Sequence, residues 1–139
     1  MPVRIAAIGV GHWHSVYDPA YLRQLLRLPD VAIAALHDPD EGLARRRAAE
    51  VGNPPVFSDY TQMLRDAKPD FVIALGKPSL MAEVAHHLSD CDFPFLMEKP
   101  MGLNAEQVRG IADKVDARGG FAALPTPQRY TPFFAHTRE

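Results

Sequence analysis

Short apolar runs alternate with amphipathic segments along almost the whole of this 139-residue chain. This alternation is typical of strands and helices that follow one another as β-α-β units. Such units close with right-handed crossovers, so they predict a mainly parallel sheet of six strands covered by helices on both faces, a doubly wound three-layer α/β fold. The predicted strands are Val3–Ile8, Val31–Leu36, Val56–Phe57, Phe71–Leu75, Phe95–Met97 and Phe121–Leu124. The predicted helices are Ala20–Leu28, Glu41–Val51, Tyr60–Ala67, Met81–Ser89 and Ala105–Arg118.

The alternation stops after Leu124, where Pro125, Pro127 and Pro132 prevent a helix from continuing. We therefore expect one domain over residues 1–124, with 125–139 as a linker or the start of a further domain. The last predicted helix has clear ends, because Asn104 can cap it, Gln107 completes a capping box and the Gly119-Gly120 pair supplies a left-handed stop.

The composition excludes several classes of protein. A formal charge of −2 and the absence of a basic stripe argue against a nucleic-acid partner. No apolar run approaches the roughly 18 residues of a membrane span, and a strand that starts at Val3 leaves no room for a signal peptide, so we expect a cytoplasmic protein. The single cysteine, Cys91, allows no internal disulfide and no thiolate cluster for zinc.

A glycine pair, Gly9-x-Gly11, follows the first predicted strand directly. Glycines at this point let the backbone turn sharply and approach a pyrophosphate, as in Rossmann-type dinucleotide-binding domains. The third glycine of the usual pattern is replaced by His14, and Asp18-Pro19 reads as the start of the first helix. We therefore expect residues 12–17 to form an inserted loop.

Asp38 ends the second predicted strand, 29 residues after Gly9 and not the usual ~20, which agrees with the inserted loop. Its carboxylate can accept hydrogen bonds from an adenosine ribose, and together with Asp40 it would repel a 2′-phosphate, which favours NAD over NADP. The alternative is that Asp38-Pro39 only forms the turn before the next helix. The basic run 45–47 is explained by surface ion pairs, Glu41 with Arg45 and Arg46 with Glu50.

Two histidine pairs resemble metal ligands, but neither has the surroundings of a metal site. His12 and His14 have no carboxylate or thiolate at a matching offset, and their spacing suits a loop that lines a pocket. His86 and His87 lie on a predicted helix at the boundary of the core. We expect no metal site.

The tripeptide Glu98-Lys99-Pro100 follows the fifth predicted strand, at the carboxyl edge of the sheet where open α/β sheets bind ligands. An amine buried at a strand end gives up its proton more readily than one in water, so Lys99 is the candidate proton carrier. Strand alternation places Glu98 on the opposite face, as a structural residue or a cofactor contact.

Taken in order, these motifs resemble the glucose-fructose oxidoreductase / inositol dehydrogenase / MocA family. They are Ile8-Gly9-Val10-Gly11, His37-Asp38-Pro39-Asp40, Val56-Phe57-Ser58-Asp59-Tyr60, Lys77-Pro78-Ser79, Glu98-Lys99-Pro100 and Arg129-Tyr130-Thr131-Pro132. The resemblance implies an NAD(P)-dependent oxidoreductase that acts on a sugar, cyclitol or similar polyol, with Lys99 beside the nicotinamide and the substrate hydroxyl. It further implies a cofactor site formed by Gly9, Gly11, His12, Trp13, Asp38, Leu75, Gly76, Pro78, Glu98 and Lys99.

The chain departs from the family pattern in three ways. The loop after Pro78 lacks the family's usual histidine, His12-Trp13-His14 stands where a small residue is expected, and no second α/β domain follows. In the family that domain supplies substrate-binding groups and usually the oligomer interface, so a homo-oligomer is expected only where it is present. We therefore expect the 139 residues alone to be inactive. The alternative is a non-catalytic nucleotide- or sugar-binding module that has kept the fold.

Overall fold

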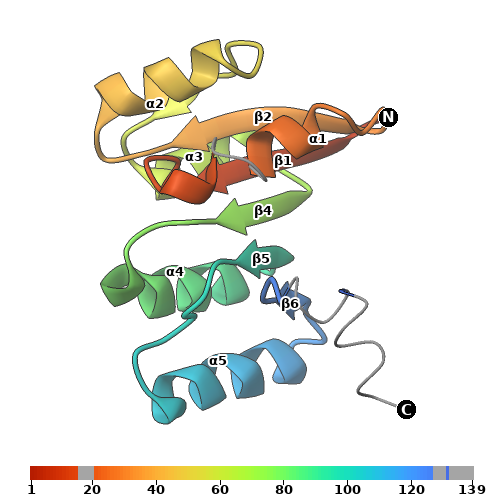
Figure 1. Ribbon diagram of the computed structural model, residues 1–139. Coiled ribbons are helices and arrows are strands. Elements are labelled where there is room, and N and C mark those ends of the chain that lie inside the picture. Colours follow the sequence, from red (N-terminus) through yellow and green to blue (C-terminus); the bar gives the residue numbers. More distant parts are fainter. Residues whose placement is uncertain (16–20, 127–130, 132–139) are drawn as a thin grey trace.

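The computed structural model describes residues 1–15, 21–126 and 131, which form a six-stranded sheet flanked by helices (Figure 1). The strands are β1 (Val3–Ile8), β2 (Val31–His37), β3 (Val56–Phe57), β4 (Phe71–Ala74), β5 (Phe95–Met97) and β6 (Ala122–Ala123). The helices are the 3-10 turn η1 (Trp13–Ser15), α1 (Tyr21–Leu25), α2 (Glu41–Ala49), α3 (Tyr60–Ala67), α4 (Pro78–Asp90) and α5 (Ala105–Ala117).

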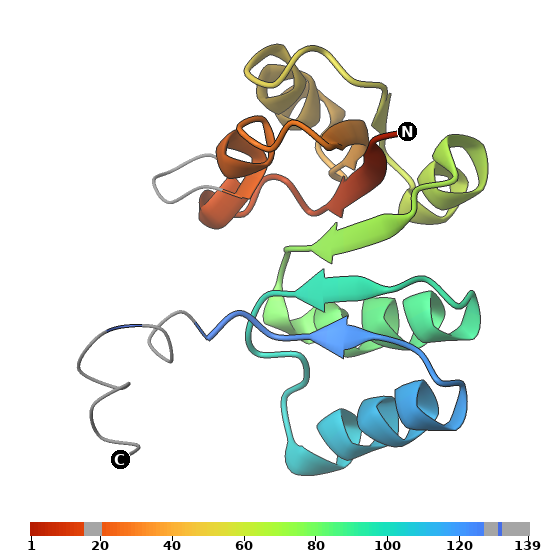
Figure 2. The same ribbon diagram turned by 90° about the vertical axis from the view of Figure 1, so that its right-hand side faces the viewer.

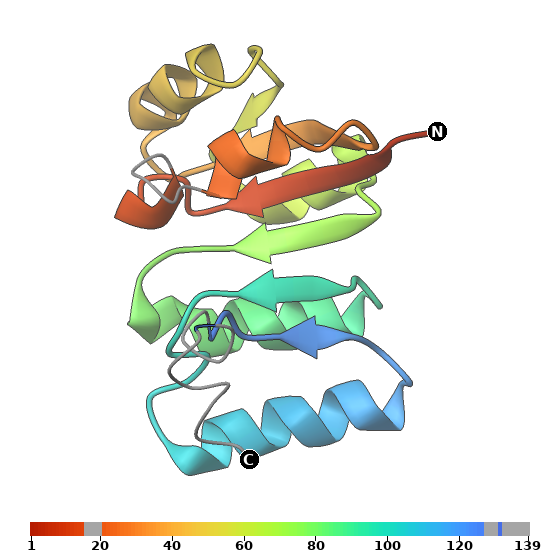
Figure 3. The same cartoon turned by 45° about the vertical axis from the view of Figure 1, so that its right-hand side comes forward.

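The strand order is β3-β2-β1-β4-β5-β6, and every neighbouring pair is parallel. The chain winds outward from β1 in one direction and then from β4 in the other, so the order reverses between these two strands. All carboxyl ends therefore lie at one edge, as the shared direction of the arrowheads shows (Figure 3). This confirms the doubly wound, parallel, three-layer fold that the alternation predicts.

Apolar side chains fill both faces of the sheet because successive strand residues point to opposite sides. On one face, Ala7 and Leu36 pack with Leu22 of α1 and with α2. On the other, Phe95 lies at the centre of a larger cluster that includes residues of α3, α4 and α5. Helices α4 and α5 lie side by side along β5 and β6 (Figure 2).

Helices α2 and α5 end at Ala49 and Ala117, two residues and one residue before their predicted ends, and α1 and α4 differ more from the predicted ranges. Helix α4 begins at Pro78, three residues before the predicted Met81, because a proline at the first helical position has the required backbone angle and no orphan N–H. Helix α1 ends at Leu25, and the backbone continues with the hydrogen bonds Arg27 N to Gln24 O and Leu28 N to Leu25 O, which close a tighter 3-10-type turn. The predicted cap Asp18 and start at Pro19 lie outside the described residues.

Candidate functional site

The turn after β1 packs directly against the turn after β4. Gly9 has φ +72°, and its N–H donates to the carbonyl oxygen of His37 at 2.8 Å. A Cβ on Gly9 would lie 2.4 Å from the backbone oxygen of Leu75, which no side chain tolerates. Glycine is therefore required here, and its bare backbone lies where the strand order reverses between β1 and β4.

Asp38 connects the end of β2 to this glycine turn. The Gly11 N–H donates to Oδ2 of Asp38 at 2.7 Å, and the Asp40 N–H donates to Oδ1 at 3.0 Å. A Cβ on Gly11 would lie 2.8 Å from the same Oδ2, so this glycine also allows the close approach. Asp40 caps α2 by accepting from Leu43 N at 2.9 Å. Asp38 thus forms the turn before α2 and also presents its carboxylate to the glycine turn.

His37, the last residue of β2, is buried beside the same turn. Its Nδ1 lies 3.4 Å from the Gly9 nitrogen, and its ring meets that of Tyr60 edge to face. Burial lowers the pKa of His37, and the nearby Asp38 and Asp59 charges only partly oppose this effect. A neutral imidazole therefore supports the glycine turn at neutral pH, a role that the sequence pattern did not assign.

Within the inserted loop predicted for residues 12–17, Trp13–Ser15 form the 3-10 turn η1. The buried Ser15 hydroxyl donates to the Val10 carbonyl at 2.5 Å and fixes this turn to the end of β1. The Trp13 and His14 rings lie 3.6 Å apart between centroids, and Trp13 is 55% exposed. Residues 16–20 lie outside the described part of the chain. The aromatic side chains of Trp13 and His14 therefore lie beside the glycine turn.

Leu75, Gly76 and Pro78 follow β4 as predicted. Leu75 is buried, and its N–H donates to the Ile8 carbonyl at 2.8 Å, which ties this segment to β1. Gly76 has φ +136°, a backbone conformation that a side chain rarely adopts. The segment therefore borders the Gly9 turn.

Glu98 lies one residue beyond β5, and its side chain is only 4% exposed. Oε1 accepts a hydrogen bond from the Tyr21 hydroxyl at 2.8 Å, and Oε2 accepts one from the Lys99 N–H at 3.0 Å. The prediction that Glu98 faces away from Lys99 is wrong, because Lys99 Nζ lies 4.0 Å from Oε2. Strand alternation ends at Met97, so it no longer dictates where these two side chains point.

The side chain of Lys99 is 65% exposed, so the prediction that its amine is buried is wrong. The reason is its position beyond the strand end, at the rim of the sheet. The Lys99–Pro100 peptide bond is cis. With its side chain this exposed, the amine projects from the carboxyl edge of the sheet toward solvent.

His14 and Tyr21 complete the surroundings of Glu98, and sequence reasoning assigned a role to neither contact. His14 Nδ1 lies 2.7 Å from Oε1 of Glu98 without forming a hydrogen bond. Burial raises the pKa of Tyr21, and the hydrogen bond and charge of Glu98 raise it further. Burial also lowers the pKa of the neighbouring His12. No local signal could predict these contacts, which join residues far apart in the sequence.

The ion pairs predicted on α2 form in part. Glu41 pairs with Arg45 on α2 as predicted, but Glu50 pairs with Arg47 and Arg23, not with Arg46. Arg45 and Arg46 are exposed, whereas the Arg47 side chain is only 19% exposed, so the basic run is a solvated face in part. Within residues 1–15, 21–126 and 131, no three histidine, cysteine, aspartate or glutamate side chains are grouped to hold a metal ion. In the same ranges no helix has the length and apolar character to cross a bilayer.

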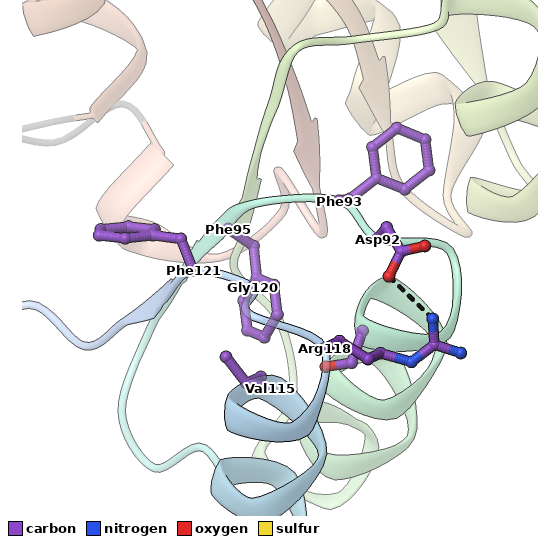
Figure 4. Close-up of a pocket in the computed structure, with 8 residues that line it drawn as sticks. Asp92, Phe93, Phe95, Val115, Arg118, Gly120 and Phe121 are labelled. Atoms are coloured by element: carbon purple, nitrogen blue, oxygen red, sulfur yellow. Dashed lines mark hydrogen bonds and ion pairs between the residues drawn. The ribbon is translucent and has the colours of Figure 1, made fainter.

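A small hollow between the α4–β5 and α5–β6 connections lies at the opposite edge of the sheet (Figure 4). Phe93, Phe95 and Phe121 line it, and the ion pair between Arg118 and Asp92 borders it at 2.8 Å. Phe95 begins β5 and the other four precede β5 or β6, whereas Lys99 follows β5. The hollow is therefore separate from the glycine turn and from the titratable cluster around Glu98.

The doubly wound sheet, the glycine turn at its reversal point and the acid that ends β2 together define the class of dinucleotide-binding domains. The match is also specific. Residues 3–123 match the family described as "Oxidoreductase family, NAD-binding Rossmann fold". The chain belongs to this family, which confirms the resemblance found in its motifs.

Two relatives show how much of a longer protein this chain covers. It is 24% identical over 136 residues to scyllo-inositol 2-dehydrogenase (NAD(+)) of Bacillus subtilis, covering 98% of this chain and 39% of the relative. It is 30% identical over 121 residues to inositol 2-dehydrogenase 2 of Saccharopolyspora erythraea, covering 86% of this chain and 34% of the relative. The chain thus spans little more than a third of the length of either relative.

Solved structures share the fold. A dehydrogenase from Chromobacterium violaceum matches with a TM-score of 0.87 at 21% identity, over 99% of this chain and 39% of that one. A myo-inositol dehydrogenase from Lactobacillus casei, solved with NAD(H) and myo-inositol, matches with a TM-score of 0.83 at 23% identity, over 95% of this chain and 39% of that one. These proteins are dehydrogenases and give no support to the alternative of a non-catalytic module.

Proposed function

We propose that this domain binds NAD in the crevice between the β1 and β4 turns and supplies Lys99 as the proton carrier of an oxidoreductase that acts on a polyol or sugar. The observation that carries the proposal is the pair of glycines that let the bare backbone pack against Leu75 O and Asp38 Oδ2. A turn without side chains, next to an oriented carboxylate, fits a pyrophosphate followed by a ribose. The relatives that act on inositol point to the substrate class.

Within this site, Gly9 and Gly11 would meet the pyrophosphate and Asp38 the adenosine ribose. His12 and Trp13 would border the cofactor at the rim, and Leu75, Gly76 and Pro78 would cover it from β4. A negative carboxylate at the ribose position, with Asp40 on the next turn, disfavours a 2′-phosphate. We therefore propose NAD as the cofactor in preference to NADP.

Lys99 and Glu98 would lie at the nicotinamide end of this site. The bound nicotinamide supplies hydride chemistry, while the chain orients the reactants and moves the proton. The Lys99 amine, exposed at the carboxyl edge, is placed to exchange a proton with a substrate hydroxyl. Its exposure means that a second wall is needed to exclude water and to orient the substrate.

We propose that such a wall belongs to a second domain, with residues 125–139 as the connection to it. The longer relatives support this, because this chain matches only 39% of the Bacillus subtilis protein. Residues 1–124 alone would then bind cofactor without turning over substrate. Any homo-oligomer would depend on the second domain.

Binding of NADH tests the cofactor assignment, because Trp13 is the single tryptophan and lies beside the glycine turn. We expect NADH to quench Trp13 fluorescence saturably, with energy transfer to the nicotinamide, and NADPH to bind more weakly. Asp38→Asn should weaken NADH binding about tenfold, since a hydrogen bond to a charged group contributes roughly 1.5–3 kcal/mol.

Two controls isolate the site. Asp66→Asn removes a carboxylate from the exposed surface of α3 and should leave the NADH affinity unchanged. Trp13→Phe should abolish the fluorescence signal while calorimetry still detects binding. If neither fluorescence nor calorimetry detects saturable NADH binding up to millimolar concentrations, the cofactor assignment is wrong.

A further inference from the structure

The Glu98 carboxylate lies between two parts of the chain that are far apart in sequence. Its Oε1 faces the first β-α unit, where the Tyr21 hydroxyl lies at 2.8 Å and His14 Nδ1 at 2.7 Å. Its Oε2 faces the loop after β5, where the Lys99 N–H lies at 3.0 Å and Lys99 Nζ at 4.0 Å. The two oxygens therefore divide their partners between two loops.

Because Glu98 is buried, these contacts determine where its carboxylate can lie. An ionised carboxylate that is 4% exposed is strongly destabilised unless donors satisfy it. The donors that carry a hydrogen bond are the Tyr21 hydroxyl and the Lys99 amide, one on each oxygen. Because burial and Glu98 itself raise the pKa of Tyr21, this phenol remains a donor throughout the neutral range. Removal of either donor leaves one oxygen of a buried anion short of a partner.

The amine of Lys99 cannot fix its own position in the described structure. Its side chain is 65% exposed, and an exposed pair at 4.0 Å contributes little because solvent screens it. The backbone of Lys99, in contrast, is held by a 3.0 Å hydrogen bond to a buried group. The direction in which the amine leaves the sheet edge therefore depends on where Oε2 of Glu98 is held.

We propose that Tyr21 and His14 are positioning residues for Lys99 and act through Glu98. This inference rests on the proposed role of Lys99 and adds residues outside the predicted site. His14 lies in η1, directly after the glycine turn, and Tyr21 begins α1. The β1–α1 segment, which would hold the pyrophosphate, therefore also orients Lys99. A displacement of the glycine turn would change the position of Lys99 through the Glu98 carboxylate.

Amide hydrogen exchange of the ¹⁵N-labelled chain tests this directly at the Lys99 N–H. Tyr21→Phe removes only the hydroxyl that donates to Oε1, and Glu98→Gln keeps the side-chain shape while removing the charge. We expect each to speed exchange at Lys99 about tenfold, the change that corresponds to about 1.4 kcal/mol of lost local stability. His14→Asn should speed it less, because His14 Nδ1 makes no hydrogen bond to Glu98 or to any other described residue.

Tyr60→Phe is the matched control, because Tyr60 is also half-buried but contacts His37 and His87 and not Glu98. It should leave Lys99 exchange at the wild-type rate. If Tyr21→Phe speeds hydrogen exchange at the Lys99 amide no more than Tyr60→Phe does, the proposal is overturned. Global unfolding would accelerate all protected amides together, so the comparison is made against the core amides of β1 and β4.

A spectroscopic measurement covers the case in which Tyr21→Phe does not fold. Phenolate absorbance should show the ionisation of both Tyr21 and Tyr60 shifted to higher pH, because burial raises the pKa of each. Glu98→Gln should bring only the Tyr21 ionisation to lower pH, because Glu98 contributes to the raised pKa of Tyr21 and not to that of Tyr60. An unchanged titration would overturn the proposal. Neither experiment uses NADH, so failure of NADH binding would leave this inference standing, and failure of the inference would leave the cofactor assignment standing.

Discussion

Gly9 is required for two independent reasons, its φ of +72° and the Leu75 backbone oxygen 2.4 Å from the position of a Cβ. The left-handed backbone alone costs a non-glycine residue roughly 1–2 kcal/mol. Backbone cannot move aside as a flexible side chain does, so the two turns would have to separate. We expect Gly9→Ala to lower the free energy of unfolding by about 3 kcal/mol, as measured by urea denaturation followed by circular dichroism.

Gly119→Ala separates the two causes. Gly119 has φ +62° but nothing within 4 Å of its Cβ position, so this variant bears only the backbone term of about 1 kcal/mol. Equal losses for the two variants would show that the contact with Leu75 relaxes without cost.

At the residue scale, the sequence predicted the site residues that directly follow the end of a strand. Gly9, Gly11 and Asp38 follow strand ends directly, and the structure places them together at the reversal of strand order. The Tyr21–Glu98 contact spans 77 residues and could not be predicted, because only the completed sheet brings α1 over the end of β5. The exposure of Lys99 was missed for a related reason, since no pattern shows where a strand's alternation ceases to apply.

Helix α5 illustrates how local signals define an element. The Asn104 side chain accepts from the Gln107 N–H at 2.9 Å, as the predicted capping box requires. The Gln107 side-chain oxygen accepts from the Leu103 N–H at 2.8 Å, and not from the Asn104 N–H as in a regular capping box. We expect Asn104→Ala to lower the free energy of unfolding by about 1 kcal/mol, because an orphan amide loses its acceptor.

Gln107→Ala provides the comparison within the same box. It removes the bond to an exposed amide that water can replace, so it should destabilise less than Asn104→Ala in the same denaturation experiment. The opposite ranking would mean that the glutamine, and not the asparagine, holds the start of α5.

At the element scale, prediction succeeded where short signals act alone. The ranges of β1, β3, β5 and α3 are those predicted, because apolar runs and the Asp59 cap bound them. The start of α4 was missed, because Lys77 precedes it without a side-chain cap and only Pro78 marks it. The early end of α1 was also missed, because Leu26 and Leu28 continue the apolar spacing although the backbone tightens.

The whole molecule depends on its larger apolar cluster, at the centre of which Phe95 is fully buried. We expect Phe95→Ala to lower the free energy of unfolding by about 3–5 kcal/mol, a large part of the total stability of a domain this size. Thermal and urea unfolding measure this loss.

Phe121→Ala is the matched control at the same hollow (Figure 4). Phe121 is 56% exposed although its carbonyl oxygen accepts from Phe95 N at 3.0 Å. Its truncation should cost well under half as much, because little apolar surface leaves water there on folding. Comparable losses would show that Phe121 packs more tightly than its exposure indicates.

At the scale of the whole molecule, the fold was fully predictable and the site only in part. Alternation of strands and helices restricts the topology to few choices, and the glycine turn after the first strand selects one of them. The crevice itself lies between elements whose loops are distant in sequence. Its composition, such as a histidine-rich turn resting on Glu98, therefore depends on packing that no periodicity encodes.

The two amides that hold the Asp38 carboxylate have a consequence for the thermodynamics of binding. Gly11 N and Asp40 N each fix one oxygen, so the carboxylate has lost its rotational freedom before any ligand arrives. A ribose hydroxyl that donates to the remaining lone pairs meets a rigid acceptor, and little side-chain entropy remains to be lost. The sugar end of a dinucleotide would thus be recognised by a group whose ordering is already complete when the domain has folded.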